Sequence, residues 1–327
     1  MNKALRIGSR GSELALWQAQ SVQQQLARFH PDVECSLLVI KTGGDIVQGA
    51  ALWKMGNKGI FIREIETALL NGEIDLAVHS LKDLPTQLPD GLVIGAITER
   101  ADVRDVFIPH PANRERTLEK QPHGAKIATG SLRRRSQLLS LRPDLEIIDF
   151  RGNVNTRFRK LGESDWAGMI LAKAGVERLG MMHQVGETLE ATVMLPAVGQ
   201  GALAIEVRDG DTLVADLVGV LNHQPTAQVT TAERALLRRL EGGCQIPVGA
   251  LGRIESANGV MPTLTLDAMV GSLDGKTVVR AKTKGLPEES EKVGAELAEI
   301  LLRNGAAGIL QSIRNLSQPG VVSRNES

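Results

Sequence analysis

Short apolar runs alternate with segments of helical periodicity along most of the chain. The run at 4–7 precedes a segment whose apolar residues recur at helical spacing, which predicts a strand and then a helix over 13–29. Ser12 stands where that helix needs an N-cap. The same pattern predicts further strands at 35–40, 76–78, 92–97, 126–128, 146–149, 167–171 and 203–207, and helices at 61–70, 132–141, 154–161, 212–221 and 226–240. This alternation indicates an α/β fold.

The pattern changes at two places, and these changes divide the chain into lobes. A charged link at 99–105 is followed by Pro109, Pro111 and Pro122, which indicate irregular chain and a crossing between domains. Gly199 and Gly201 favour a flexible return crossing. We therefore expect two doubly wound α/β lobes that resemble two-lobed periplasmic binding proteins. Lobe 1 comprises 1–100 and 198–221, and lobe 2 comprises 101–197.

A third, smaller domain is expected at 222–327. Short alternating segments such as 263–270 and 277–283 predict an antiparallel sheet, and a helix over 288–302 would cover it. This α+β domain carries Cys244, which follows two glycines at the end of the helix over 226–240. A thiol without neighbouring bulk suits a reactive or modified cysteine, although a lone cysteine is more often structural.

Charge and composition narrow the classes of partner. The 327 residues include 38 basic and 38 acidic ones, so no global field attracts nucleic acid or an anionic membrane. No segment suits a signal peptide or a membrane span, and we expect a cytoplasmic protein. Cys35 and Cys244 lack the spacing of a zinc site, so no metal is expected.

Candidate chemistry centres on the stretch 74–85. A buried strand ends there in a polar cluster with Ser80, Lys82 and Asp83, and Pro85 closes the cluster. Ligands of open α/β sheets bind outside the carboxyl ends of strands. A carboxylate beside an ammonium at this position could hold a proton or face a developing cation, which makes Asp83 the first catalytic candidate. The alternative is that Asp83 and Ser80 only fix a turn through hydrogen bonds to the backbone.

Basic residues gather at other predicted strand ends. Arg10 follows the first strand, and two strand-to-helix turns at 129–131 and 150–153 lead into helices that carry arginines. The segment 126–160 holds nine basic and three acidic residues, which favours an anion site, although a charge run is usually a solvated face. The glycine-rich connection 42–59 carries Lys54 and Lys58 and predicts a mobile lid over an anionic ligand.

Five motifs in order and spacing resemble the porphobilinogen deaminase family, also called hydroxymethylbilane synthases. They lie at 78–85, 131–134, 151–153, 196–202 and 240–247, and the resemblance covers nearly the whole chain. Gly130 departs from the pattern, because many members carry a second serine there.

The resemblance implies a transferase of porphyrin (haem) biosynthesis that joins four porphobilinogen molecules head to tail, with loss of ammonia, to give the linear tetrapyrrole hydroxymethylbilane. It also implies a dipyrromethane cofactor bound by a thioether to Cys244, and a monomer. Asp83 would be the catalytic carboxylate. The residues that would hold cofactor or substrate are Cys244, Ser80, Lys82, Asp83, Thr129, Ser131, Arg133, Arg134, Arg10, Arg151, Arg157, Arg178, Lys54 and Lys58.

Two other functions remain as alternatives. A two-lobed binding protein could hold a small polycarboxylate between cationic lobes without any catalytic step. Nucleic-acid binding through 133–160 is disfavoured by the zero net charge and by the small number of aromatic residues.

Overall fold

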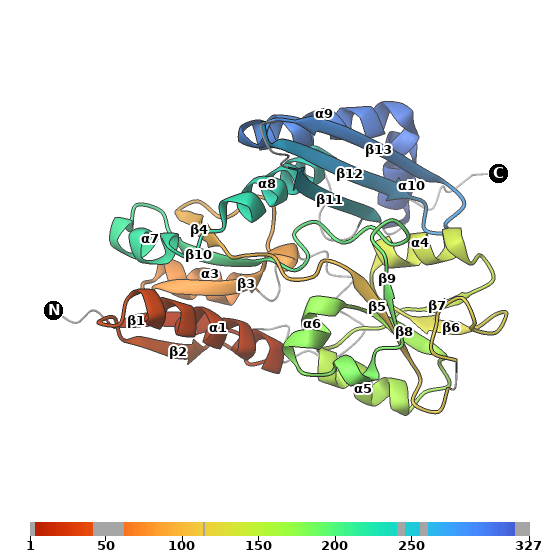
Figure 1. Ribbon diagram of the computed structural model, residues 1–327, viewed down its shortest axis with the longest axis horizontal. Helices are drawn as coiled ribbons and strands as arrows, with labels where there is room; N and C mark the ends of the chain where they lie inside the picture. The colour runs from red at the N-terminus through yellow and green to blue at the C-terminus, as the bar shows by residue number, and fades with distance from the viewer. Residues whose placement is uncertain (1–3, 42–61, 114, 241–245, 256–260, 318–327) are drawn as a thin grey trace, which may run out of the picture.

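The computed structural model describes residues 4–41, 62–113, 115–240, 246–255 and 261–317. Strands in these ranges form two five-stranded sheets and one three-stranded sheet. Figure 1 shows the two larger sheets with their helices side by side, and the three-stranded sheet packed across them. Lys54, Lys58 and Cys244 lie outside the described residues.

The sheet of lobe 1 has the order β2-β1-β3-β10-β4. Its strand β1 is parallel to β2 and β3, whereas β10 is antiparallel to both β3 and β4. Helices α1 and α7 pack on one face and α3 packs on the other, so the sheet is covered on both sides. The bounds are β1 Leu5–Ser9, β2 Cys35–Val39, β3 Leu76–Ser80, β4 Leu92–Ile97, β10 Leu203–Arg208, α1 Glu13–Phe29, α3 Arg63–Leu70 and α7 Thr212–Gly219.

The sheet of lobe 2 repeats this plan with the order β7-β6-β8-β5-β9. Strand β6 is parallel to β7 and β8, and β5 is antiparallel to β8 and β9. Helix α4 covers one face, and α5 and α6 cover the other. The bounds are β5 Asp105–Pro109, β6 Lys126–Ala128, β7 Glu146–Ile148, β8 Gly168–Ala172, β9 Glu187–Leu189, α4 Leu132–Leu141, α5 Val154–Gly162 and α6 Lys173–Arg178.

The chain passes from the first sheet to the second between β4 and β5, and it returns between β9 and β10. The first passage leads directly into β5 and the second into β10. Each of these strands is the fourth in the order of its sheet and is antiparallel to its neighbours. The expectation of irregular chain near Pro109 was wrong, because β5 is a fully buried strand that ends at Pro109. Proline is tolerated there because the missing N–H falls at the end of the ladder. The predicted α/β class with two doubly wound lobes is confirmed.

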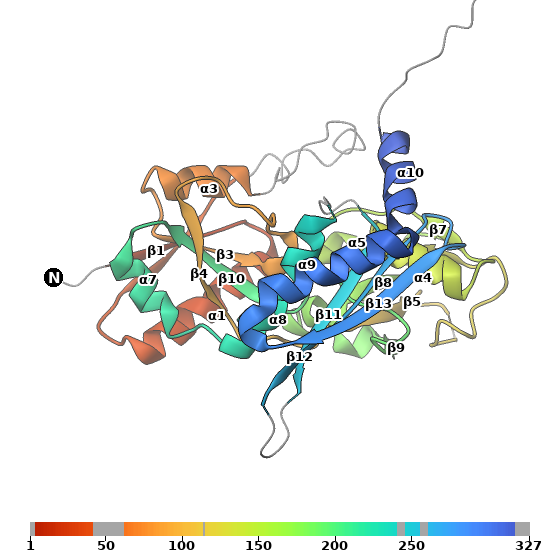
Figure 2. The same cartoon turned by 90° about the horizontal axis from the view of Figure 1, so that it is seen from above.

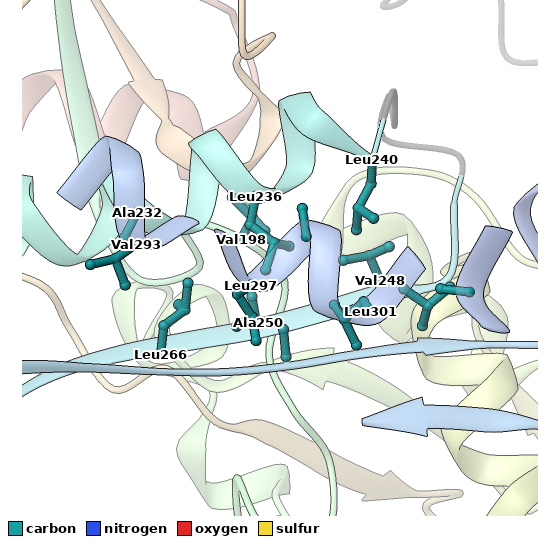
Figure 3. Close-up of a cluster of buried hydrophobic side chains, with 14 of the residues drawn as sticks. Val198, Ala232, Leu236, Leu240, Val248, Ala250, Leu266, Val293, Leu297 and Leu301 are labelled. Carbon is teal, nitrogen blue, oxygen red and sulfur yellow. The ribbon is translucent and has the colours of Figure 1, made fainter. Parts of the chain in front are cut away.

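The antiparallel sheet β11-β12-β13 is also confirmed, and helices α8 and α9 cover it. Figure 3 shows Leu236 of α8 and Leu297 of α9 gathered over Ala250 of the sheet, with Leu240, directly after α8, over Val248. Figure 2 shows α8 and α9 running across the sheet, one beside the other. The bounds are α8 Gln224–Arg239, β11 Val248–Glu255, β12 Thr263–Gly271, β13 Val278–Gly285, α9 Ser290–Leu301 and α10 Ala307–Ser317. Short turns of other helix types lie at Leu81–Asp83, Met182–Gln184, Pro287–Glu289 and Leu302–Ala306.

Among the described residues, none of the helices combines the length and the apolar character that crossing a bilayer requires.

Candidate active site

The carboxyl end of β3 presents Ser80, Lys82 and Asp83. Strand β3 is buried up to His79, and residues 81–83 form one turn of 3₁₀-helix whose Leu81 is buried. Ser80 Oγ accepts a hydrogen bond of 2.8 Å from Gln18 Nε2 on α1, and Ser80 does not cap the short helix. The Asp83 side chain is exposed and, within the described part of the chain, accepts no hydrogen bond. The turn-fixing alternative for these two side chains therefore finds no support.

Two strand-to-helix turns of lobe 2 lie against each other. Ser131 caps α4 by accepting from the Arg134 amide at 3.4 Å, and Thr129 Oγ1 accepts from the Ser131 amide at 3.3 Å. A Cβ atom at Gly130 would lie 2.6 Å from the carbonyl oxygen of Phe150, in the second turn. A serine at position 130 therefore requires the turns to separate, which gives a physical reason for glycine at this position.

Arg133 and Arg134 hold one buried carboxylate. Arg133 Nη1 lies 2.7 Å from Asp105 Oδ2, and Arg134 Nη2 lies 2.8 Å from Asp105 Oδ1. Arg133 also donates to the Leu195 carbonyl at 2.6 Å, and Gln200 Nε2 donates to Asp105 Oδ1 at 2.9 Å. The two guanidinium groups overcome the desolvation of Asp105 and hold its pKa well below the usual range.

Asp105 and Gln200 were missed as partners of the candidate residues. The sequence places Asp105 in a charged link, with nothing local to indicate a buried carboxylate. Its two arginines lie 28 and 29 residues away.

Lys82 connects the end of β3 with this cluster. Its side chain is half-buried, and desolvation lowers the pKa of its ammonium to about 8. Asp83 and Asp105 raise the pKa, and Arg134 and Arg133 lower it further. Because these charges act on Lys82, the end of β3 in lobe 1 faces the start of α4 in lobe 2.

Arg157 and Arg151 stand on the second turn. Burial lowers the pKa of Arg157 to about 10. The positive charges of Arg134 and Arg151 lower this pKa further, and the negative charges of Asp83 and Asp149 raise it. Arg157 Nε donates to the Gly152 carbonyl at 2.8 Å. Arg151 is exposed and, like Lys82, makes no hydrogen bond or ion pair with any described residue. Beside Asp83 the site thus offers two cations, Lys82 and Arg151, that pair with no carboxylate in the described part of the chain.

Arg10 follows β1 of lobe 1, and Arg178 on α6 contacts lobe 1 from lobe 2. Arg10 is half-buried directly after β1. Arg178 Nη2 donates to the Gly201 carbonyl at 2.8 Å, and its guanidinium lies 5.5 Å from the Trp17 ring centroid. Burial lowers the pKa of Arg178. Arg178 therefore joins α6 to α1 and to the return passage of the chain.

Fold and site together define a two-lobed α/β protein with a carboxylate and several cations at the facing ends of its sheets. Residues 5–216 match the family described as porphobilinogen deaminase, dipyromethane cofactor binding domain, and residues 227–303 match the porphobilinogen deaminase C-terminal domain. The chain belongs to the porphobilinogen deaminase family.

Similar curated proteins carry the same name. The chain is 51% identical to the porphobilinogen deaminase of Chlorobium phaeobacteroides (strain BS1) over 96% of this chain and 99% of that protein. It is 52% identical to that of Chlorobaculum parvum, again over 96% and 99%. Among solved structures, the periplasmic VFT2 domain of Bordetella pertussis BvgS aligns with a TM-score of 0.40 and 10% identity, covering 67% of this chain and 86% of that one.

Proposed function

We propose that this chain is a hydroxymethylbilane synthase, a transferase that joins four porphobilinogen molecules head to tail. Each condensation breaks the aminomethyl C–N bond of one substrate, releases ammonia, and forms a C–C bond to the free α-carbon of the acceptor pyrrole, which loses a proton. Water releases the finished linear tetrapyrrole. Family membership and identity above 50% over nearly the full length support this activity.

The charges of the site suit this substrate. Each porphobilinogen unit carries an acetate and a propionate, so the growing chain gains two negative charges per step. Lys82 and Arg151 have no carboxylate partner among the described residues, and they can bind these groups without breaking an existing ion pair. Arg134 lies close enough to act on both Lys82 and Arg157, and Thr129 and Ser131 stand at the start of the helix that carries Arg134. Arg133 already donates hydrogen bonds to Asp105 and to the Leu195 carbonyl, so it contributes to ligand binding mainly through its positive charge.

Asp83 is the proposed catalytic carboxylate. Positive charge develops on the pyrrole as ammonia departs, and an anionic carboxylate near that charge stabilises the transition state. The acceptor carbon must then lose a proton, which a carboxylate within reach can accept. Asp83 is exposed and has no side-chain partner among the described residues, so both of its oxygens are available for these steps.

A dipyrromethane cofactor fits the same charges, because its four carboxylates can pair with Lys82 and Arg151, which form no ion pair with any described residue. When bound, this cofactor supplies the pyrrole carbon on which growth begins. We propose a thioether from Cys244 as its attachment, with Ser80, Lys82, Asp83, Thr129, Ser131, Arg133 and Arg134 holding it. Arg10, Arg151, Arg157, Arg178, Lys54 and Lys58 would hold the substrate.

Intact-mass spectrometry before and after brief exposure to porphobilinogen tests this proposal. We expect excess mass on the Cys244 peptide, and a ladder of added pyrrole units after exposure. The Cys244→Ser variant should lose the modification, whereas Cys35→Ser should keep it. Cys35 is a suitable control because it is half-buried in β2 and burial raises the pKa of its thiol.

Asp83→Asn tests the catalytic assignment. The variant should keep the attached cofactor and lose turnover by about 10²–10⁴-fold. Asp90→Asn is the matched control, since Asp90 is an exposed carboxylate of the same lobe. Near-normal turnover in Asp83→Asn would remove Asp83 from the mechanism. An unmodified Cys244, no ladder and saturable porphobilinogen binding would instead favour the binding-protein alternative.

The division into lobe 1, lobe 2 and a C-terminal domain at 1–100 with 198–221, 101–197 and 222–327 is part of the proposal, as are the monomeric state and the cytoplasmic location. Limited proteolysis tests the boundaries, and light scattering tests the monomer.

A further inference from the structure

The position of Asp83 is set through its backbone, because its side chain has no partner among the described residues. On the preceding side, Ser80 pairs with Leu203 of β10, and the Leu81 amide donates to the Ala202 carbonyl at 3.0 Å. On the following side, Pro85 has no N–H and cannot continue the ladder. The Leu84 amide donates back to the Leu81 carbonyl at 3.2 Å, which leaves the carbonyls of Leu84 and Pro85 for another group.

Arg234 of α8 holds this following segment. Its Nη1 donates to the Leu84 carbonyl at 3.1 Å, and its Nη2 donates to the Pro85 carbonyl at 2.6 Å. The Arg234 residue is 8% exposed, and its bond to Leu84 is buried while its bond to Pro85 is partly buried. A planar fork with two nitrogens on two successive carbonyls restrains the direction of the chain as well as its distance.

The neighbouring residue of α8 restrains the other side of the same turn. Glu233 Oε2 accepts from the Gly199 amide at 2.7 Å. Gly199 has φ +72°, and a Cβ atom there would lie 2.9 Å from Leu81 Cγ, so this glycine packs directly on the short helix that ends at Asp83. Two successive residues of α8 thus restrain residues 81–85: Arg234 binds the carbonyls that follow Asp83, and Glu233 binds the glycine that packs on Leu81.

Helix α8 is also anchored in the C-terminal domain. It ends at Arg239, five residues before Cys244, and Leu236 and Leu240 anchor this end in the core of the C-terminal sheet (Figure 3). Figure 1 shows α8 between that sheet and the sheet of lobe 1. One helix therefore joins the carbonyls beside Asp83 to the core of the C-terminal sheet.

We propose that Arg234 is a positioning residue for Asp83, and that it fixes the catalytic carboxylate by holding the backbone that follows it. This inference rests on the proposed role of Asp83. Arg234 acts through the backbone carbonyls of Leu84 and Pro85 and does not touch the substrate.

Arg234→Met and Arg234→Lys test the proposal in the cofactor-loaded enzyme. Arg234→Met keeps much of the side-chain volume and removes both hydrogen-bond donors. Arg234→Lys keeps the positive charge, but a single nitrogen must then serve both carbonyls. We expect kcat per loaded enzyme to fall by about 10²-fold in Arg234→Met, in line with the cost of misplacing a reacting group by an ångström. The value for Arg234→Lys should lie between those of Arg234→Met and wild type. KM and the loaded fraction, measured by intact mass, should stay unchanged.

Arg238→Met is the matched control, because Arg238 lies one turn further along α8 and pairs with Glu291 at the surface. It should keep wild-type kcat. Wild-type kcat in Arg234→Met, or equal losses in the Arg234 and Arg238 variants, would overturn the proposal. If circular dichroism shows Arg234→Met to be unfolded, Arg234→Lys decides, and its wild-type kcat would overturn the proposal. Failure of the underlying function is distinguishable, since wild type itself would then be inactive and Asp83→Asn would match it.

Discussion

Glu233 is a buried carboxylate that accepts hydrogen bonds from both chain segments that connect the two lobes. Its Oε1 accepts from Arg100 Nη1 at 2.7 Å and from the Gly252 amide at 2.8 Å. Its Oε2 accepts from Arg100 Nη2 at 3.0 Å and from the Gly199 amide at 2.7 Å. Arg100 belongs to the outgoing passage, Gly199 to the return passage and Gly252 to β11. A single carboxylate thus joins three parts of the chain.

The Glu233→Gln variant keeps the shape of this side chain and removes its charge. Each carboxylate oxygen of Glu233 already accepts two hydrogen bonds. Whichever oxygen the new NH₂ group of glutamine replaces, it faces two N–H donors and can accept from neither. Arg100 would also keep its charge at 10% side-chain exposure without the carboxylate. Breaking one partner of a buried pair costs about 3–5 kcal/mol. That is a large share of a typical total of about 5–15 kcal/mol.

Urea unfolding followed by circular dichroism measures this loss. Glu291→Gln is the control, because Glu291 also pairs with an arginine but is 65% exposed, and its free energy of unfolding should change by less than about 0.5 kcal/mol. A loss below about 1 kcal/mol in Glu233→Gln would refute the reasoning, since it would mean that the buried donors find other acceptors at little cost.

Three further predictions concern charge and packing. The Lys82 pKa of about 8 means that its ammonium is present below that pH and lost above it. Cofactor loading of the apoprotein, measured by intact mass, should therefore fall above pH 8 in wild type and stay flat in Lys82→Arg; a flat wild-type profile would contradict this. Because the pKa of Asp105 is lowered, its contribution to stability is present above the ordinary carboxyl pKa of about 4 and is lost as the pH falls through the lowered value. Asp105→Asn should therefore unfold more easily at pH 7 and show a weaker acid dependence in urea titrations between pH 4 and pH 2; an unchanged acid slope would argue against it. Gly168→Ala should lose about 1–3 kcal/mol in thermal unfolding, because its Cβ would lie 2.3 Å from Phe107 Cε2, whereas Gly162→Ala, with no atom within 4 Å of its Cβ, should lose nothing.

The local pattern of apolar and capping residues was sufficient to predict many of the helices and strands. The helix expected over 13–29 forms at Glu13–Phe29, and Ser12 caps it as predicted. The strand at 126–128 and the helix at 132–141 also have the expected bounds. Apolar periodicity and capping act over a few neighbouring residues, so the sequence contains the information in one place. The candidate residues at the end of β3 were found for the same reason, because a strand end with polar side chains is a local pattern.

Tertiary structure alone decided which partners those residues have. Strand β5 was not predicted, because its burial comes from β8 and β9, which follow it by more than 50 residues in the sequence. The pairing of Asp105 with two arginines and the contact of Arg234 with the carbonyls of Leu84 and Pro85 join positions that are 28 to 150 residues apart. Desolvation and ion pairing depend on which groups the fold brings together. The sequence therefore determined the identity of the chemical groups, and the fold determined which of them are buried, paired or left available to a ligand.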